Sequence, residues 1–142
     1  MADPASSSPD LVRRLYEAIN RRDAEAGFAM LDPEFEWEVP ERSLLGGTHR
    51  GHGEVREALF AELEVFDEFR VDPEELFDGK DRVVAFVRQT ARGGASGAAV
   101  EIRIGHLWTL RGGKAVRLQV FPEREQALEA AGLGPSGTSG RS

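Results

Sequence analysis

The stretch from His106 to Phe121 constrains the fold more than any other part of the chain. Its apolar residues alternate with polar ones on both sides of the pair Gly112-Gly113. Glycine accepts the positive φ angles that tight hairpin turns require, and alternation with a period of two is typical of strands. The stretch therefore predicts two antiparallel strands that are joined at the glycine pair.

A two-residue turn also predicts which side chains share a face. The mixed face then holds three opposed pairs: Trp108 with Arg117, His106 with Gln119, and Ile104 with Phe121. The other face is uniformly apolar and carries Leu107, Val116, Leu118 and Val120. Burying the polar groups of the mixed face without partners costs about 1–3 kcal/mol each. We therefore expect that face to border solvent, a partner subunit or a polar-lined cavity.

The chain has 142 residues, which is enough for one domain with a buried core. Residues 1–9 and 134–142 are rich in Ser, Gly and Pro and offer little apolar surface to bury. We expect flexible tails at both ends of a domain at residues 10–133. Cysteine is absent, which excludes disulfides, thiolate chemistry and cysteine-ligated metals.

Charge and hydropathy argue against two classes of partner. The formal net charge of −7 disfavours binding to nucleic-acid phosphates, which requires clustered positive charge. No apolar run approaches the ~18 residues of a membrane span, and we expect no secretory signal in residues 1–9, which are too polar for its apolar region. We expect a cytoplasmic protein that binds neither nucleic acid nor membranes.

The remaining pattern predicts helices and strands in separate blocks. We expect helices from an N-cap at Asp10, from Asp23 to Leu31 (closed by Asp32-Pro33), from Glu54 to about Phe66, and over 122–131. We expect strands at Phe35–Val39, 69–77 with a bend at Pro73, 83–90 and 100–110, and a loop over 41–53. Segregated strands and helices indicate an α+β fold.

Five segments together resemble a known family: residues 15–23, 35–40, 49–56, 106–114 and 121–133. Over about residues 10–133 the chain resembles a SnoaL-like member of the NTF2-like (nuclear transport factor 2-like) superfamily. The resemblance implies a cone-shaped α+β fold, in which a curved, mostly antiparallel sheet wraps three helices and a short C-terminal helix follows. It also implies a cavity at the open end and a homodimer packed through the sheets.

The family does not by itself define an activity, because its members include ketosteroid isomerases, polyketide cyclases, dehydratases, epoxide hydrolases and non-catalytic binders. In isomerase-like members an aspartate precedes the proline after the first strand, whereas this chain has Val39 before Pro40. The resemblance places His106 near the position of their oxyanion-binding acid. SnoaL-type cyclases pair a carboxylate with a histidine, and residues 100–110 and 115–121 contain no aspartate. Both chemistries are therefore disfavoured.

Several residues are candidates for a site, each with a plainer structural alternative. His106 could act as acid or base, with Gln119 orienting it, or could be a hydrogen-bonded histidine of a sheet or dimer surface. Trp37 and Phe121 could form the apolar wall of a pocket, in which Tyr16 would supply a hydroxyl group. Aromatic residues at such spacing are, however, commonly ordinary core residues. Arg88 could bind an anionic ligand, or pair in solvent or at an interface, as could Arg103.

Other polar groups favour structural interpretations. The resemblance places Glu38 near the strand end at which catalysts of the family sit, but this residue is most simply an exposed strand charge. The acidic segment 62–68 is most simply a solvated helix end. His49 and His52 lack the further ligands of a metal site, and we expect neither metal nor cofactor.

Three functions remain open at this stage. The first is a cofactor-independent lyase, isomerase or hydrolase that acts on a small apolar or mixed-polarity molecule through His106. The second is a non-catalytic module that binds such a molecule. The third is a structural homodimer in which the mixed face is the subunit contact.

Overall fold

The computed structural model describes residues 8–40, 46–93 and 97–133. Its helices are α1 (Ser8–Asn20), α2 (Ala24–Ala29), α3 (Gly51–Val65) and α4 (Arg124–Ala131). Its strands are β1 (Leu31–Val39), β2 (Gly47–Arg50), β3 (Phe66–Asp78), β4 (Arg82–Gly93), β5 (Ala99–Arg111) and β6 (Lys114–Phe121). The predicted α+β class is confirmed. Of the expected tails, residues 1–7 and 134–142 lie outside the described residues, and Ser8 and Pro9 already belong to α1.

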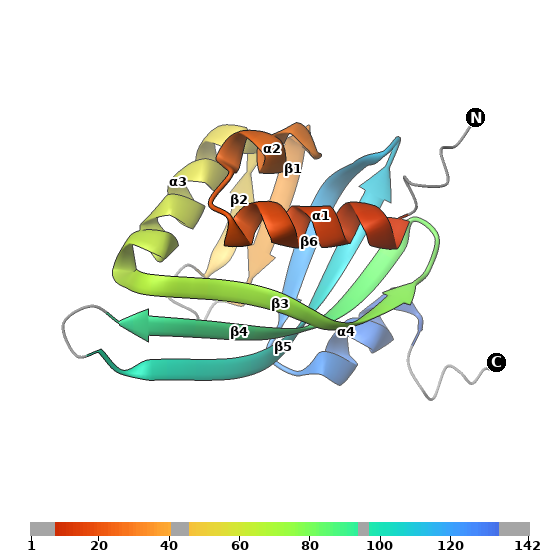
Figure 1. The fold of residues 1–142 in the computed structure, drawn as a ribbon. Coiled ribbons are helices and arrows are strands. Elements are labelled where there is room, and N and C mark those ends of the chain that lie inside the picture. Colours follow the sequence, from red (N-terminus) through yellow and green to blue (C-terminus); the bar gives the residue numbers. More distant parts are fainter. Residues whose placement is uncertain (1–7, 41–45, 94–96, 134–142) are drawn as a thin grey trace.

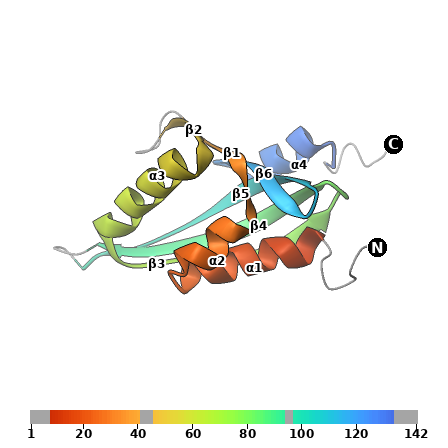
Figure 2. The same ribbon diagram turned by 90° about the horizontal axis from the view of Figure 1, so that it is seen from above.

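The strands form one sheet in the order β2-β1-β6-β5-β4-β3. Neighbours are antiparallel except β1 and β6, which are parallel. The strand direction turns strongly from β1 and β2 at one edge to β3 at the other (Figure 1). α3 and the α1–α2 pair stand apart on one side of this sheet, while α4 lies on the other side (Figure 2). Within the described residues, no helix is long and apolar enough to cross a membrane.

Side chains alternate between the two faces of the sheet and build two cores. On β4, Val83, Ala85 and Val87 face inward toward α1 and α3. Val84 and Phe86 face outward and pack with α4. A Cβ on Gly105 of β5 would lie 2.9 Å from Ala127 Cβ, so glycine is needed where α4 rests on the sheet. We call the side that faces α1 and α3 the inner face, and the side that carries α4 the outer face.

The predicted hairpin is present, but its predicted register is wrong. Gly112 and Gly113 form the turn with positive φ, and Arg111 lies opposite Lys114. The register then shifts between Thr109 and Leu110, because Val116 is an extra residue on β6. A one-residue slip moves every later side chain of a strand to the other face. Beyond this bulge the opposed pairs are Trp108 with Leu118, His106 with Val120, and Gly105 with Phe121.

The bulge removes the expected uniform apolar face. Leu118 and Val120 lie on the inner face with His106 and Trp108, whereas Leu107 packs outward against α4. The bulge also places Arg117 on the outer face, where its guanidinium forms an ion pair with Glu38. Burial of aliphatic residues and pairing of the charge both favour the bulged register.

Several predicted boundaries also differ from the structure, and the second helix ends at Ala29 instead of Leu31. α1 begins at Ser8, so Asp10 lies in its first turn and is not its N-cap. β1 begins at Leu31 and includes Pro33, which lies between the paired positions Leu31 and Glu36 and therefore breaks no regular ladder. Part of the predicted loop 41–53 forms edge strand β2 and the start of α3, while residues 41–45 lie outside the described residues.

Other local predictions are confirmed. Asp23 caps α2, because its carboxylate accepts a hydrogen bond from the Ala26 amide at 3.1 Å. The β3–β4 register shifts between Pro73 and Glu75, where the bend was expected. Gly132 adopts the left-handed conformation at the end of α4.

Candidate functional site

Tyr16 of α1 forms hydrogen bonds with two side chains of β5. The Trp108 indole nitrogen donates to the Tyr16 hydroxyl at 2.8 Å, and this hydroxyl lies 2.7 Å from Nδ1 of His106. The Tyr16 and His106 rings also stack, with centroids 5.8 Å apart. All three side chains are buried. Two residues at i and i+2 of a strand share a face, so β5 presents His106 and Trp108 together to the helix.

The hydrogen-bond pattern determines where the protons lie. An indole N–H can only donate, and a hydroxyl has a single proton. Among the described residues, the Tyr16 hydroxyl has no acceptor other than Nδ1 of His106. Tyr16 therefore accepts from Trp108 and donates to His106, which assigns the neutral ring its proton at Nε2.

Burial keeps both groups uncharged. It lowers the pKa of His106 from 6.5 to about 3. It also raises the pKa of the Tyr16 hydroxyl, against the smaller opposing effect of the Trp108 hydrogen bond. A ring with so low a pKa is a weak base at neutral pH. The group that His106 offers to a ligand is therefore the Nε2–H donor.

His106 and Tyr16 line a cavity of about 570 Å³ on the inner face, which we call the sheet chamber. Its wall is mostly apolar and comes from α1, α3 and strands β1, β3, β4, β5 and β6. Polar side chains in the wall include Tyr16, Glu62, Gln89 and His106. This volume and this mixture of apolar wall and few polar groups are typical of small-molecule sites.

Glu62 is a member of the site that the sequence analysis missed. It lies on α3, is only partly exposed and lines the sheet chamber, whereas we expected a solvated helix end. Burial raises the pKa of its carboxyl group. No described residue forms an ion pair or hydrogen bond with this carboxyl group. The spacing of Val55, Leu59 and Glu62 is i, i+4 and i+7, which places the carboxylate on the inward face of α3 and could have identified it.

Trp37 also lines the chamber, as does Arg103, whose guanidinium forms ion pairs with Glu74 and Glu101 at 3.2 and 3.0 Å. The Trp37 side chain is half-buried, and its ring lies 5.6 Å from that of His49. The indole nitrogen is buried and has no hydrogen-bond partner within the described part of the chain. A buried donor without a partner is unfavourable, so this N–H is available to a ligand.

The other three expected site residues lie on the outer face and do not adjoin His106. The Gln119 amide donates to Glu38 at 3.3 Å, and Phe121 packs in the core under α4. Arg88 is half exposed and forms an ion pair with Glu101 at 3.6 Å. The expected pairing of His106 with Gln119 is wrong because the β6 bulge turns Gln119 to the other side.

Of the two remaining histidines, His49 and His52, the second has a local structural role. The His52 Nε2–H group donates toward the carbonyl oxygens of Leu31 and Asp32, at 3.2 and 3.1 Å. Across residues 8–40, 46–93 and 97–133, no cluster of three or more His, Asp or Glu side chains is placed to hold a metal ion.

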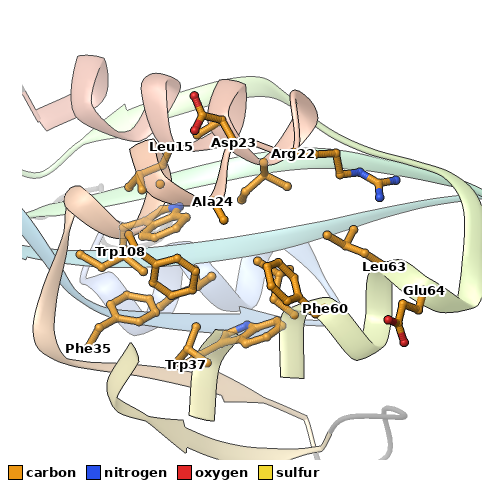
Figure 3. Close-up of a pocket in the computed structure, with 18 of the residues that line it drawn as sticks. Leu15, Arg22, Asp23, Ala24, Phe35, Trp37, Phe60, Leu63, Glu64 and Trp108 are labelled. Atoms are coloured by element: carbon orange, nitrogen blue, oxygen red, sulfur yellow. The ribbon is translucent and has the colours of Figure 1, made fainter. Parts of the chain in front are cut away.

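A second hollow of about 490 Å³ lies between α1, α2 and α3, and we call it the helical chamber. Figure 3 shows apolar side chains such as Leu15, Phe35 and Leu63 converging on it from the helices and β1. The charged groups of Arg22 and Glu64 point away from this apolar cluster (Figure 3). The interior of the helical chamber is therefore apolar, with charges at its rim.

Comparison with known proteins identifies a family and a fold that agree with the α+β architecture described above. Residues 12–118 match the family model of the SnoaL-like domain. The structure of TerC co-crystallised with polyporic acid is similar, with 28% identity, coverage of 87% of this chain and 96% of that chain, and a TM-score of 0.73. An NTF2-like protein of unknown function from Burkholderia pseudomallei has 27% identity, coverage of 85% and 94%, and a TM-score of 0.74.

A more distant structure shares the fold alone. It is a putative SnoaL-like polyketide cyclase from Jannaschia sp. CCS1, with 17% identity, coverage of 85% and 90%, and a TM-score of 0.72. No curated protein matches this chain. Because the family model spans most of the domain and the solved NTF2-like structures share its fold, the chain belongs to the SnoaL-like domain family of the NTF2-like superfamily.

Proposed function

We propose that this protein binds a small, largely apolar carbonyl compound in the sheet chamber and catalyses a cofactor-independent proton transfer on it. The observation that carries the proposal is the hydrogen-bond chain Trp108–Tyr16–His106, which leaves His106 neutral with its proton at Nε2. A fixed N–H donor in an apolar wall suits a carbonyl oxygen that gains negative charge during a reaction.

Glu62 supplies the second chemical requirement. Its carboxyl group lines the same chamber, and burial raises its pKa, which makes the carboxylate a stronger base than an exposed one. The carboxylate takes a proton from the carbon next to the carbonyl group, and His106 Nε2–H stabilises the enolate oxygen. Return of that proton to another carbon completes an isomerisation, and loss of a leaving group from the β-carbon completes an elimination.

The choice of residues differs from the sequence-based expectation. We expected His106 to act as the acid or base, whereas in this proposal His106 donates a hydrogen bond and Glu62 is the acid–base group. Val39 lines the sheet chamber next to Pro40, so the pre-proline position offers no carboxylate there. The similar structure of TerC with polyporic acid supports a small organic ligand in this fold. The expected homodimer stays a prediction, which sedimentation at micromolar concentration would test.

Exchange of hydrogen for deuterium tests the proposal without knowledge of the natural substrate. NMR follows the protons next to the carbonyl group of acetophenone and cyclohexenone in D₂O. We expect the protein to accelerate this exchange over buffer, Glu62→Gln to abolish the acceleration, and His106→Phe to reduce it by about 10²–10³. A protein that binds these ketones without accelerating exchange is a non-catalytic binder, and the catalytic half of the proposal is then wrong.

A further inference from the structure

The helical chamber has no role in the chemistry above, yet it adjoins the sheet chamber directly. Five side chains line both hollows: Ile19, Trp37, Leu59, Trp108 and Leu118. They come from five different elements, α1, β1, α3, β5 and β6. The partition between the chambers therefore consists of single side chains, one from each of these five elements.

The partition is not uniformly packed. Trp108 and Leu118 are buried and form its floor, whereas Ile19, Trp37 and Leu59 are only partly buried. A rotamer change at a partly buried side chain disturbs fewer packed neighbours than one at a fully buried side chain. The part of the wall between α1 and α3 can therefore open, while the floor stays in place.

The two chambers differ in polarity. The sheet chamber contains the hydrogen-bonding groups of Tyr16, His106, Gln89 and Glu62. The helical chamber is lined by apolar side chains, apart from Arg22, Asp23 and Glu64 at its rim. The indole nitrogen of Trp37, which lines both, has no partner among the described residues. A ligand that matches both chambers has an oxygen-bearing end and an apolar end.

We propose that the two chambers form one elongated site for an amphiphilic ligand, with its oxygen-bearing head beside His106 and its apolar chain in the helical chamber. The position of the head rests on the proposed function. The position of the chain rests on the shared wall and the apolar lining. The substrate class is therefore a carbonyl compound with an extended hydrocarbon or aryl tail, and not a compact molecule that fills the sheet chamber alone.

A homologous series of phenyl alkyl ketones, from acetophenone to octanophenone, tests the proposal by titration. Trp37 and Trp108 are the two tryptophans of the chain, and both line both chambers, so their fluorescence reports binding. If each added methylene enters the helical chamber, affinity rises by up to about fourfold per methylene, which corresponds to ~0.8 kcal/mol.

Gly27→Leu tests where the chain of the ligand lies. Gly27 lines the helical chamber, and a Cβ there is in ordinary van der Waals contact with Ala18 Cβ, at 3.7 Å, so the first atom of an added side chain is tolerated. We expect the affinity ratio of octanophenone to acetophenone to fall at least tenfold in Gly27→Leu. Ala24→Leu fills the same chamber from another position and repeats the test if Gly27→Leu does not fold. Far-UV circular dichroism checks the fold of both.

The outcomes separate this inference from the proposed function. Affinity that does not rise with chain length, or a ratio that is unchanged in both filled variants, overturns the elongated site. His106→Phe probes the head alone, and it should weaken acetophenone and octanophenone by the same factor. If His106→Phe changes neither affinity while the filled variants lower the ratio, the helical chamber binds the chain but the proposed role of His106 is wrong.

Discussion

The hydroxyl oxygen of Tyr16 lies 2.7 Å from Nδ1 of His106, although the two residues are 90 positions apart in the chain. The contact joins α1 to β5 at the wall of the sheet chamber. It fixes both the orientation and the tautomer of the imidazole ring, because Trp108 occupies the acceptor side of the same hydroxyl. A helix-to-sheet packing contact thereby becomes part of the candidate site.

Removal of the Tyr16 hydroxyl should destabilise the protein. Tyr16→Phe leaves the Trp108 N–H and the His106 Nδ1 atom without partners in a buried site, and each such group costs about 1–3 kcal/mol. We expect a loss of about 2–4 kcal/mol in the free energy of unfolding, measured by urea denaturation. The double variant Tyr16→Phe with His106→Leu should lose less than the sum of the two single changes. A change below about 0.5 kcal/mol in Tyr16→Phe would contradict the network.

The stability of the fold should fall as the pH is lowered below about 6.5. His106 has a pKa of 6.5 in the unfolded reference and about 3 in the folded protein. Between these values the unfolded chain binds the extra proton, so folding loses up to about 1.4 kcal/mol per pH unit. Urea denaturation at pH 7, 5.5 and 4 measures this slope.

The matched control for the pH profile is His106→Phe, which removes the imidazole. Its slope between pH 6.5 and 4 should be smaller than that of the parent protein. Glu62, in the same chamber, contributes to the pH dependence of stability with the opposite sign, because its pKa is raised in the folded protein. Both proteins retain Glu62, so the difference between their slopes reports His106 alone. Identical slopes would show that His106 titrates normally in the folded state.

Glu62→Gln should stabilise the protein at neutral pH while it removes the proposed catalysis. The pKa of Glu62 is raised in the folded protein, so its ionisation favours the unfolded chain as the pH rises above about 4.5. Because the side chain is partly exposed, we expect only a small gain in the free energy of unfolding at pH 7, which disappears near pH 4. Glu64→Gln, on the exposed side of the same helix, is the control and should change little. Destabilisation by Glu62→Gln at pH 7 would mean that the carboxylate has a stabilising partner.

The contact between Gly105 and α4 should tolerate no added methyl group. In Gly105→Ala the new Cβ lies 2.9 Å from Ala127 Cβ and 3.1 Å from the Arg124 Cα, so α4 must move away. Overpacking of this kind costs about 1–3 kcal/mol, which thermal unfolding measures as a lower Tm. Gly53→Ala in α3 is the control, because its Cβ meets nothing within 4 Å. Equal Tm values for the two variants would contradict the close packing of α4.

Residue periodicity and turn chemistry were enough to predict much of the fold. The Asp23 cap, the bend at Pro73 and the glycine turn of the last hairpin are local features, and the structure confirms them. The bulge at Val116 is different, because nothing in the local pattern of β6 distinguishes a regular strand from a bulged one. The bulge is favoured by burial of Leu118 and Val120 and by pairing of Arg117 with Glu38, which are tertiary effects.

This single slip accounts for the main error in the expected site. Gln119 and Phe121 follow the bulge, and both lie on the outer face. His106 lies on β5 and Trp37 on β1, so neither side chain is turned by the extra residue of β6, and both line the sheet chamber. Glu62 was overlooked because its acidic neighbours suggested solvent, although its spacing from Leu59 and Val55 places it on the inward face of α3.

The most direct test of the account is the protonation state of the His106 ring, measured by two-dimensional ¹H–¹⁵N NMR of the imidazole groups. His106→Gln assigns the signals, and His49 and His52 serve as internal references. We predict a neutral ring with its proton at Nε2 that does not titrate between pH 8 and 5, and an Nε2–H signal that shifts when acetophenone is added. A proton at Nδ1, or titration near pH 6.5, would contradict the central role of the Tyr16–His106 hydrogen bond.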